Sequence, residues 1–342
     1  MDISLFDYRL PEKSIAQKPA SPRDSARMLV LQKGSPRLHD ANIFDLPEFL
    51  QKGDVLVFNK SRVIPARLYG IKETGGKVEV LLLQKISVNT WEVLLGGKRI
   101  HVNTCVRFGR GLTGCVIKKK TDGTARVKFS IGGKKFIKML SSVGHTPIPP
   151  YIKTPARASQ YQTIYADPRK PGSAAAPTAG LHFTKRLFTA LRRKGIQVEF
   201  VTLHVGLGTF APVKTRDIKQ HKIHPEFIEV EAKTRERLYQ AKKEGRRIIA
   251  VGTTTVRTLE SVFVARRPRK FLNIRAWVHP FFYPGYHFRA VDGMLTNFHL
   301  PKSTLFMLVS AFAGRKRMLA AYRHAIRSKY RFYSFGDAML LL

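Results

Sequence analysis

The sequence predicts an α/β protein in which a mostly parallel sheet, flanked by helices, is interrupted by a small antiparallel β-barrel. Three observations lead to this prediction. Strand-like and helix-like runs alternate beyond residue 150, short runs with period-two alternation fill residues 68–150, and a continuous apolar run precedes them. Strands that alternate with helices form parallel sheets covered on both faces, whereas short strands joined by tight turns form barrels.

The first 67 residues end in an apolar strand followed by a polar turn. Residues 55–58 are continuously apolar, as expected for a strand buried on both faces, and the turn carries Asn59, Arg62 and Arg67. Because this strand is of the parallel type, we expect residues 1–67 and 151–342 to form one discontinuous α/β catalytic domain. Residues 68–150 would then be an inserted β-barrel domain.

The barrel prediction rests on five short runs punctuated by glycines. They cover residues 77–83, 91–95, 102–108, 114–118 and 125–131. The positions expected to be exposed are mostly Lys and Arg, for example Lys118, Lys119, Lys120, Lys134 and Lys135. Two interpretations stay open: lysines that protect edge strands from pairing, and lysines that contact phosphates.

The region after residue 150 supplies the helices and most of the sheet. Its patterns predict helices over residues 184–194, 233–244 and 319–328 and one that starts near residue 256, strands over 198–202 and 247–251, and a buried apolar element over 305–313. That apolar run is far too short to cross a bilayer.

The charge of the chain favours a polyanionic partner. Its 342 residues contain 61 Lys and Arg against 23 Asp and Glu, a formal net charge of +38. Phosphate contacts release condensed counterions, so nucleic acid fits such an excess, although a generally basic composition would also produce it. The sequence shows no signal peptide, lipidation motif or basic amphipathic helix, so we expect a cytoplasmic protein without a membrane partner.

The two cysteines, Cys105 and Cys115, argue against a secreted scaffold built on disulfides. Together with His101 they could offer metal ligands, but the segment between them resembles a strand, a turn and a strand. We therefore expect both to be buried small apolar residues, and we expect no metal.

Four polar, glycine-bearing segments follow strands or precede helices, where free N–H groups and helix dipoles favour ligands. They cover residues 177–183, 203–210, 252–260 and 296–304. Each alone is as consistent with ordinary turns and helix caps as with a site; Arg257, for instance, could simply pair with Glu260 on a helix surface. Their joint occurrence predicts an active site.

Several enzyme classes lose support because their motifs are missing. The sequence contains no Gly-x-Ser-x-Gly elbow, no Walker loop and no nucleophilic cysteine signature. The Gly206-Leu207-Gly208 turn lacks the third glycine of a dinucleotide fingerprint. The polar segments are rich in Thr, His, Arg and Asn, which are suited to binding a polar small molecule and to transferring protons.

At these segments the chain closely resembles the S-adenosylmethionine:tRNA ribosyltransferase-isomerase family of queuosine biosynthesis. The matching stretches run nearly end to end and include residues 6–11, 22–27, 53–67, 176–183, 201–210, 221–226, 249–261, 283–286, 292–314 and 330–338. The barrel segment resembles the family mainly in pattern. Residues 278–281 depart from it, because more aliphatic residues are usual there, and the chain is more basic than many relatives.

The resemblance implies an α/β domain interrupted by a small barrel and an unusual use of S-adenosylmethionine as co-substrate. The ribosyl portion is transferred to the 7-aminomethyl-7-deazaguanine base at the wobble position of a tRNA. It is then isomerised to an epoxycyclopentane, giving epoxyqueuosine and releasing adenine and methionine. We expect a monomer whose partners are tRNA and S-adenosylmethionine.

Such a reaction needs a base for the proton beside the sulfonium, an acid for the departing adenine, and a pocket that excludes water. Our candidates for proton transfer are His204, His182 and His299. The candidates for binding S-adenosylmethionine are Thr178, Gly180, Gly206, Gly208, Thr253, Thr254, Thr255 and Arg257, with Arg257 on the methionine carboxylate. Those for the modified base or its phosphates are Asn59, Arg62, Arg67 and Asn297.

Two alternatives belong to other classes. A non-catalytic RNA-binding module would explain the charge and the barrel but not the histidine and threonine loops. A methyltransferase would release S-adenosylhomocysteine, and the missing Gly-x-Gly-x-Gly turn speaks against it. Under the ribosyltransferase hypothesis, His204→Ala should abolish turnover and Arg257→Ala should weaken S-adenosylmethionine binding.

Overall fold

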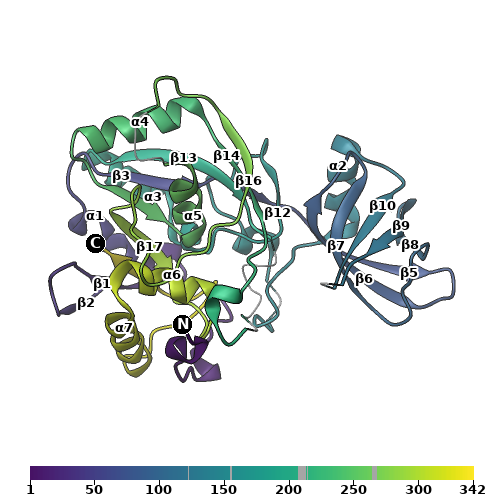
Figure 1. Cartoon of the computed structure of the whole chain (residues 1–342), viewed down its shortest axis with the longest axis horizontal. Helices are drawn as coiled ribbons and strands as arrows, with labels where there is room; N and C mark the ends of the chain where they lie inside the picture. The colour runs from purple at the N-terminus through teal and green to yellow at the C-terminus, as the bar shows by residue number, and fades with distance from the viewer. Residues whose placement is uncertain (122, 155, 207–212, 214, 264–267) are drawn as a thin grey trace. The chain divides into compact units, whose positions relative to one another are not determined.

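The computed structural model describes residues 1–342 except 122, 155, 207–212, 214 and 264–267. It divides into two compact units (Figure 1). The α/β unit comprises Met1–Ser61, Pro150–Asp167 and Ala176–Leu342, and the barrel unit comprises Arg62–Pro149 and Pro168–Ala175. The predicted fold class, an α/β sheet flanked by helices with an antiparallel barrel, is confirmed. The barrel unit includes residues 62–67 and 168–175, outside the range of 68–150 expected from the sequence.

The α/β unit is built on one nine-stranded sheet. In spatial order its strands are β16 (Ile274–Val278), β14 (Glu226–Val230), β13 (Gln197–His204), β3 (Val55–Asn59), β15 (Ile248–Val251), β17 (Gly293–Asn297), β18 (Ala338–Leu341), β1 (Arg27–Leu31) and β2 (Leu38–Asn42). The central strands β13, β3, β15 and β17 are mutually parallel, so their carboxyl ends meet at one edge.

Antiparallel pairs occur on both sides of this centre, although β18 and β1 pair parallel with each other. β14 and β16 pair antiparallel beyond β13, β18 pairs antiparallel with β17, and β2 pairs antiparallel with β1. The sheet is therefore mixed, with parallel pairing concentrated in the middle. The direction of pairing follows the burial of the strands. β3 and β15 are buried at every residue, whereas the edge strands β16 and β2 have partly exposed or exposed side chains. Half-exposed strands are typical of antiparallel pairing.

Helices cover the central strands. They are α1 (Leu46–Phe49), α3 (Lys185–Arg193), α4 (Ala232–Lys243), α5 (Thr253–Val262), α6 (Thr304–Ala313) and α7 (Arg315–Arg327). Leu187 and Leu191 of α3 join Leu56 and Phe58 of β3 in one core cluster. α4 and α5 pack against β13 and β15. The helices predicted from sequence are confirmed within a few residues, and the apolar run is α6. None of the described helices is long and apolar enough to span a membrane.

The barrel unit contains a closed six-stranded antiparallel barrel. Around it run β5 (Arg67–Lys72), β6 (Lys77–Lys85), β7 (Thr90–Gly96), β10 (Thr124–Phe129), β9 (Leu112–Lys119) and β8 (Cys105–Gly109), and β8 pairs back with β5. Helix α2 (Gly133–Val143) buries Phe136, whose ring packs on Trp91 and Phe129. The remaining short pairs are β4 (Arg62–Val63) with β12 (Pro171–Ser173) and β11 (Gly144–His145) with β5.

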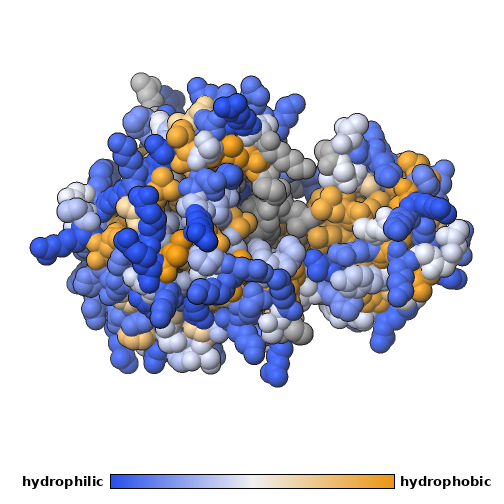
Figure 2. Space-filling model, turned by 90° about the horizontal axis from the view of Figure 1, so that it is seen from below, coloured by the Kyte–Doolittle hydropathy of each residue, from blue (hydrophilic) through white to orange (hydrophobic). Residues whose placement is uncertain are grey.

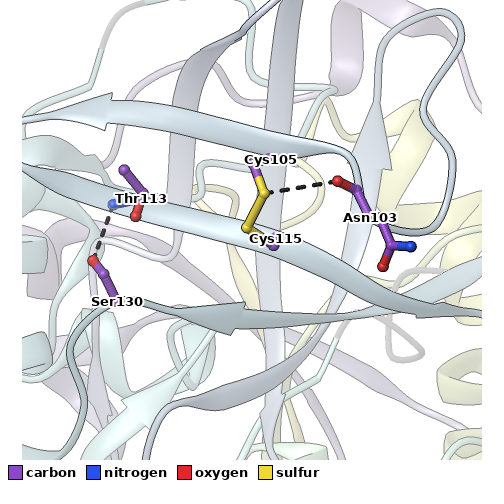
Figure 3. The surroundings of a disulfide bond; sticks show 5 residues. All are labelled: Asn103, Cys105, Thr113, Cys115 and Ser130. Atoms are coloured by element: carbon purple, nitrogen blue, oxygen red, sulfur yellow. Dashed lines mark hydrogen bonds between the residues drawn. A yellow bond between two sulfur atoms is a disulfide. The ribbon is translucent and has the colours of Figure 1, made fainter.

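The two cysteines correct one prediction. Cys105 of β8 and Cys115 of β9 lie directly opposite each other and form a disulfide, with their Cα atoms 4.1 Å apart (Figure 3). The expectation that both are buried, unbridged apolar residues is therefore wrong. The sequence pattern did predict a strand, a turn and a strand, but it left the register of the hairpin open, and the register is what places the two sulfur atoms side by side.

Candidate functional site

A cavity of about 220 Å³ lies within the α/β unit at the carboxyl ends of β15 and β17. This is the edge where ligands gather in open parallel sheets. Its polar lining comes from three of the four segments singled out in the sequence and from the loop before β18. These polar residues are Thr178, Thr253, Thr254, Thr296, Asn297, His299, Ser303 and Ser334.

The turn from β15 into α5 is shaped by Gly252, whose φ of 89° is rarely adopted by other residues. Thr253 and Thr254 line the cavity in the first turn of α5. The helical hydrogen bonds begin one residue later, where Thr255 and Val256 donate to Gly252 O at 3.0 and 3.2 Å. Thr255 does not line the cavity, because its hydroxyl donates back to Val251 O at 2.8 Å. Among described residues, Thr254 Oγ1 is buried without a hydrogen-bond partner.

His299 lies just after β17 and lines the cavity. Its Nε2 is 2.9 Å from Thr296 Oγ1, its backbone N–H donates to the Tyr322 hydroxyl at 3.0 Å, and its carbonyl accepts from the Tyr8 hydroxyl. Burial lowers its pKa to about 3, and the nearby positive charge of Arg257 acts in the same direction. The imidazole is therefore neutral at pH 7; Thr296 contacts its Nε2, while Tyr322 and Tyr8 hold the backbone of His299.

His182 ends the 3-10 helix η6 (Thr178–His182) beneath the cavity. It is 5 % exposed, its Nε2 is 3.2 Å from Asn297 Nδ2, and burial lowers its pKa to about 4. Gly180, in the same turn, does not line the cavity. A Cβ at that position would lie 1.8 Å from the Tyr165 hydroxyl, so Gly180 is required by packing.

The structure describes only part of the remaining polar segment, residues 203–210. His204 is the last residue of β13, half-buried, and its ring stacks parallel to that of Phe227 at 6.1 Å. Val205 lines the cavity, whereas His204 and Gly206 do not. Gly208, expected to contact S-adenosylmethionine, lies outside the described residues.

Arg257 is buried in an ion pair with Glu226 and does not line the cavity. The guanidinium Nη1 is 2.6 Å from Glu226 Oε2, and the two side chains are 3 % and 4 % exposed. The expected alternative, a surface pair with Glu260, is wrong. The Glu260 carboxylate instead accepts the N–H groups of Ala290 and Val291 at 3.0 and 3.1 Å and so secures the loop before β17.

Asn59, at the end of β3, and the following Arg62 and Arg67 do not line the cavity. Asn59 is fully buried and bridges strands: its Nδ2 donates to Leu203 O at 2.9 Å, while its Oδ1 accepts from the Leu203 and Ser61 N–H groups at 3.0 Å. Arg62 is exposed on β4, and Arg67 begins β5 with its Nε 3.1 Å from Glu79 Oε1. The last two belong to the barrel unit.

Three polar residues of the cavity lining lie outside the four segments singled out in the sequence. Tyr151, Tyr333 and Ser334 line the cavity, with the Tyr151 hydroxyl 2.6 Å from Ser334 Oγ and the two tyrosine rings 4.8 Å apart. Burial raises the pKa of Tyr151 to about 12. Tyr333 and Ser334 lie in the stretch 330–338 that resembles the family, but no local pattern connects them with Tyr151, about 180 residues earlier in the chain. In the described part of the chain, no group of three or more His, Cys, Asp or Glu side chains could hold a metal ion.

The two buried histidines predict a pH-dependent stability. An unfolded histidine titrates near pH 6.5, whereas His182 and His299 stay neutral down to about pH 4 and 3. Between pH 7 and 5 the unfolded state binds protons that the folded state cannot, so stability falls as pH falls. We expect about 2 kcal/mol of lost unfolding free energy per ring, measured by urea denaturation. In His299→Gln, the change of unfolding free energy between pH 7 and 5 should be roughly half of that in the wild type. His279→Gln, at an exposed histidine, is the control and should leave the change as it is. An unchanged pH dependence in His299→Gln would contradict the role given to the buried histidines.

Known proteins resemble this chain along its whole length. The chain matches the family described as Queuosine biosynthesis protein over residues 3–341. It is 49% identical to the S-adenosylmethionine:tRNA ribosyltransferase-isomerase of Carboxydothermus hydrogenoformans and 50% identical to the protein of that name from Moorella thermoacetica, in both cases over 100% of either chain. A crystal structure of S-adenosylmethionine tRNA ribosyltransferase from Thermotoga maritima shares 36% identity and a TM-score of 0.58, covering 99% of this chain and 100% of that one. The resemblance found in the sequence is confirmed, and the chain belongs to the S-adenosylmethionine:tRNA ribosyltransferase-isomerase family of queuosine biosynthesis proteins.

Proposed function

We propose that this protein transfers the ribosyl portion of S-adenosylmethionine to 7-aminomethyl-7-deazaguanine at the wobble position of tRNA and isomerises it, forming epoxyqueuosine and releasing adenine and methionine. The observation that carries the proposal is the cavity at the carboxyl edge of the parallel strands, because its lining comes largely from the polar segments that the sequence predicts to form an active site. The relatives' names supply both substrates. We also propose that it acts in the cytoplasm, where tRNA is found.

The methionine carboxylate is proposed to sit at the start of α5. There the N–H groups of Thr253 and Thr254 precede the first helical hydrogen bonds, and the positive end of the helix dipole favours an anion. Thr254 Oγ1, buried at the same place without a partner, supplies a further donor. This arrangement replaces Arg257 as the direct carboxylate ligand, since its guanidinium pairs with Glu226.

The proton chemistry is proposed to centre on His299. A sulfonium acidifies the hydrogens on the adjacent ribose carbon, and a neutral imidazole that lines the cavity can accept one of them. The contact between Nε2 and Thr296 Oγ1 orients the ring. Apolar neighbours in the lining, Leu300, Pro301 and Leu305 among them, would keep water from the resulting carbanion.

The tRNA is proposed to contact the barrel unit. That unit contains 19 Lys and Arg and 4 Asp and Glu, a higher ratio of basic to acidic residues than in the rest of the chain. On the barrel unit, Figure 2 shows hydrophilic side chains interspersed with hydrophobic patches. Exposed Arg62 is retained as a phosphate contact, whereas Arg67 has Glu79 as its partner and Asn59 has a structural role.

The experiment that tests the function uses tRNA carrying the aminomethyl precursor. Incubation with S-adenosylmethionine should release free adenine and produce a heavier nucleoside, both detected by liquid chromatography and mass spectrometry. The same tRNA with an unmodified wobble guanine is the control and should yield neither. Release of S-adenosylhomocysteine instead would identify a methyltransferase, and the absence of both products with folded protein would refute the proposal.

A further inference from the structure

Asn297 presents a buried hydrogen-bond acceptor at the cavity. The residue ends β17, is 3 % exposed and belongs to the cavity lining. Its Nδ2 faces two acceptors, His182 Nε2 at 3.2 Å and Asp337 O at 3.4 Å. A flipped amide would put its oxygen against the Asp337 carbonyl, so these contacts fix Oδ1 on the other side of the amide. Among described residues, nothing donates to Oδ1.

His182 completes a short chain of hydrogen bonds that holds this amide. Its ring also bonds to the backbone of Arg23. A neutral imidazole has one N–H and one acceptor nitrogen, so the nitrogen that faces the Asn297 N–H group is the acceptor. Burial keeps the ring neutral. Both ring nitrogens are thus occupied by contacts that orient Asn297, and His182 itself does not line the cavity.

A buried acceptor without a donor costs about 1–3 kcal/mol unless a ligand supplies one. The lining around Asn297 selects the kind of donor. It contains the aromatic rings of Tyr151, Phe298 and Tyr333, and no Asp or Glu among its described residues. A positively charged ammonium would lack a counter-ion there, whereas the neutral amine of a flat heterocycle fits both the amide oxygen and the rings.

We propose that Asn297 Oδ1 accepts a hydrogen bond from the exocyclic amine of the adenine of S-adenosylmethionine, and that His182 is a positioning residue that fixes the amide. The inference rests on the proposed function and deepens it, because it assigns the 6-aminopurine end of the substrate to this side of the cavity. It also removes His182 from the candidates for proton transfer.

The first test compares S-adenosylmethionine with its inosine counterpart, in which a carbonyl oxygen replaces the amine. The wild-type protein should bind S-adenosylmethionine about 10–100-fold more tightly in calorimetry, because two acceptors would otherwise face each other. Asn297→Ala should reduce the preference below about threefold, while the exposed amide variant Gln220→Ala keeps it. Equal binding of both compounds by the wild type overturns the inference without any variant. If the wild type binds no S-adenosylmethionine at all, the proposed function itself fails.

The second test separates positioning from proton transfer at His182. In His182→Gln, the glutamine amide oxygen can reach the position of the histidine Nε2 and accept the hydrogen bond from Asn297 Nδ2, but the amide does not titrate. We expect His182→Gln to keep the preference for the amine and to retain turnover within about tenfold, and His182→Ala to lose the preference. Loss of turnover by more than about 100-fold in His182→Gln, with affinity and preference intact, would make the ring a proton carrier and overturn its positioning role.

Discussion

Replacing His299 by Gln is expected to lower turnover by about 10²–10⁴-fold, the usual contribution of a general base. The ring lines the cavity, is oriented by Thr296 and is neutral at physiological pH, so it carries an unprotonated nitrogen. Gln preserves the size of the side chain and a contact with Thr296 but cannot take a proton. The affinity for S-adenosylmethionine should therefore change by less than about threefold.

Single-turnover release of adenine measures the chemical step, and calorimetry measures the dissociation constant separately. The matched comparison is His204→Ala, because His204 ends β13 next to a lining residue but does not line the cavity itself. Unchanged turnover in His299→Gln, together with loss of turnover in His204→Ala, would assign the proton to the end of β13 as the sequence suggested. Loss in both would require two proton carriers, one for the ribose carbon and one for the departing adenine.

The sequence predicted the centre of the fold better than its margins. Residues 55–58 and 248–251 are apolar throughout, and only strands buried on both faces need that pattern, so parallel β3 and β15 could be foreseen. The antiparallel neighbours could not. The direction of β18 depends on how residues 298–337 return to the sheet, and those residues form two helices whose packing is set by tertiary contacts.

The sequence predicted which loops form the candidate site, but not which of their side chains bind a ligand and which stabilise the fold. Thr253, Thr254, Asn297 and His299 line the cavity, as their positions after parallel strands suggested. Asn59 shares that position and residue type with Asn297, yet its amide is consumed by the backbone of Leu203. Whether a polar side chain serves a ligand or its own fold depends on which neighbouring strand comes within 3 Å, and that is decided by the register of the sheet.

Removing one partner of the buried pair of Arg257 and Glu226 should be among the most destabilising single substitutions. Arg257→Met leaves the Glu226 carboxylate, 4 % exposed, without its guanidinium partner, and we expect the unfolding free energy to fall by about 3–5 kcal/mol in urea denaturation. The matched control lies on the same strand. Glu229 of β14 faces Arg275 at 3.8 Å, but that arginine side chain is 69 % exposed, so Arg275→Met should cost less than about 1 kcal/mol. Equal losses in the two variants would contradict the assignment.

A double variant then decides whether Arg257 also binds substrate. Replacing both charges, as in Glu226→Leu with Arg257→Met, removes the unpaired carboxylate and should recover most of the lost stability, since apolar pairs often replace buried ion pairs without cost. In that folded background the dissociation constant of S-adenosylmethionine should stay within about threefold of the wild type if the carboxylate lies at the start of α5. A rise of more than tenfold would mean that the guanidinium reaches the ligand, as the sequence first suggested. The ion pair would then position a binding residue, and the N–H groups of Thr253 and Thr254 would share the carboxylate with it.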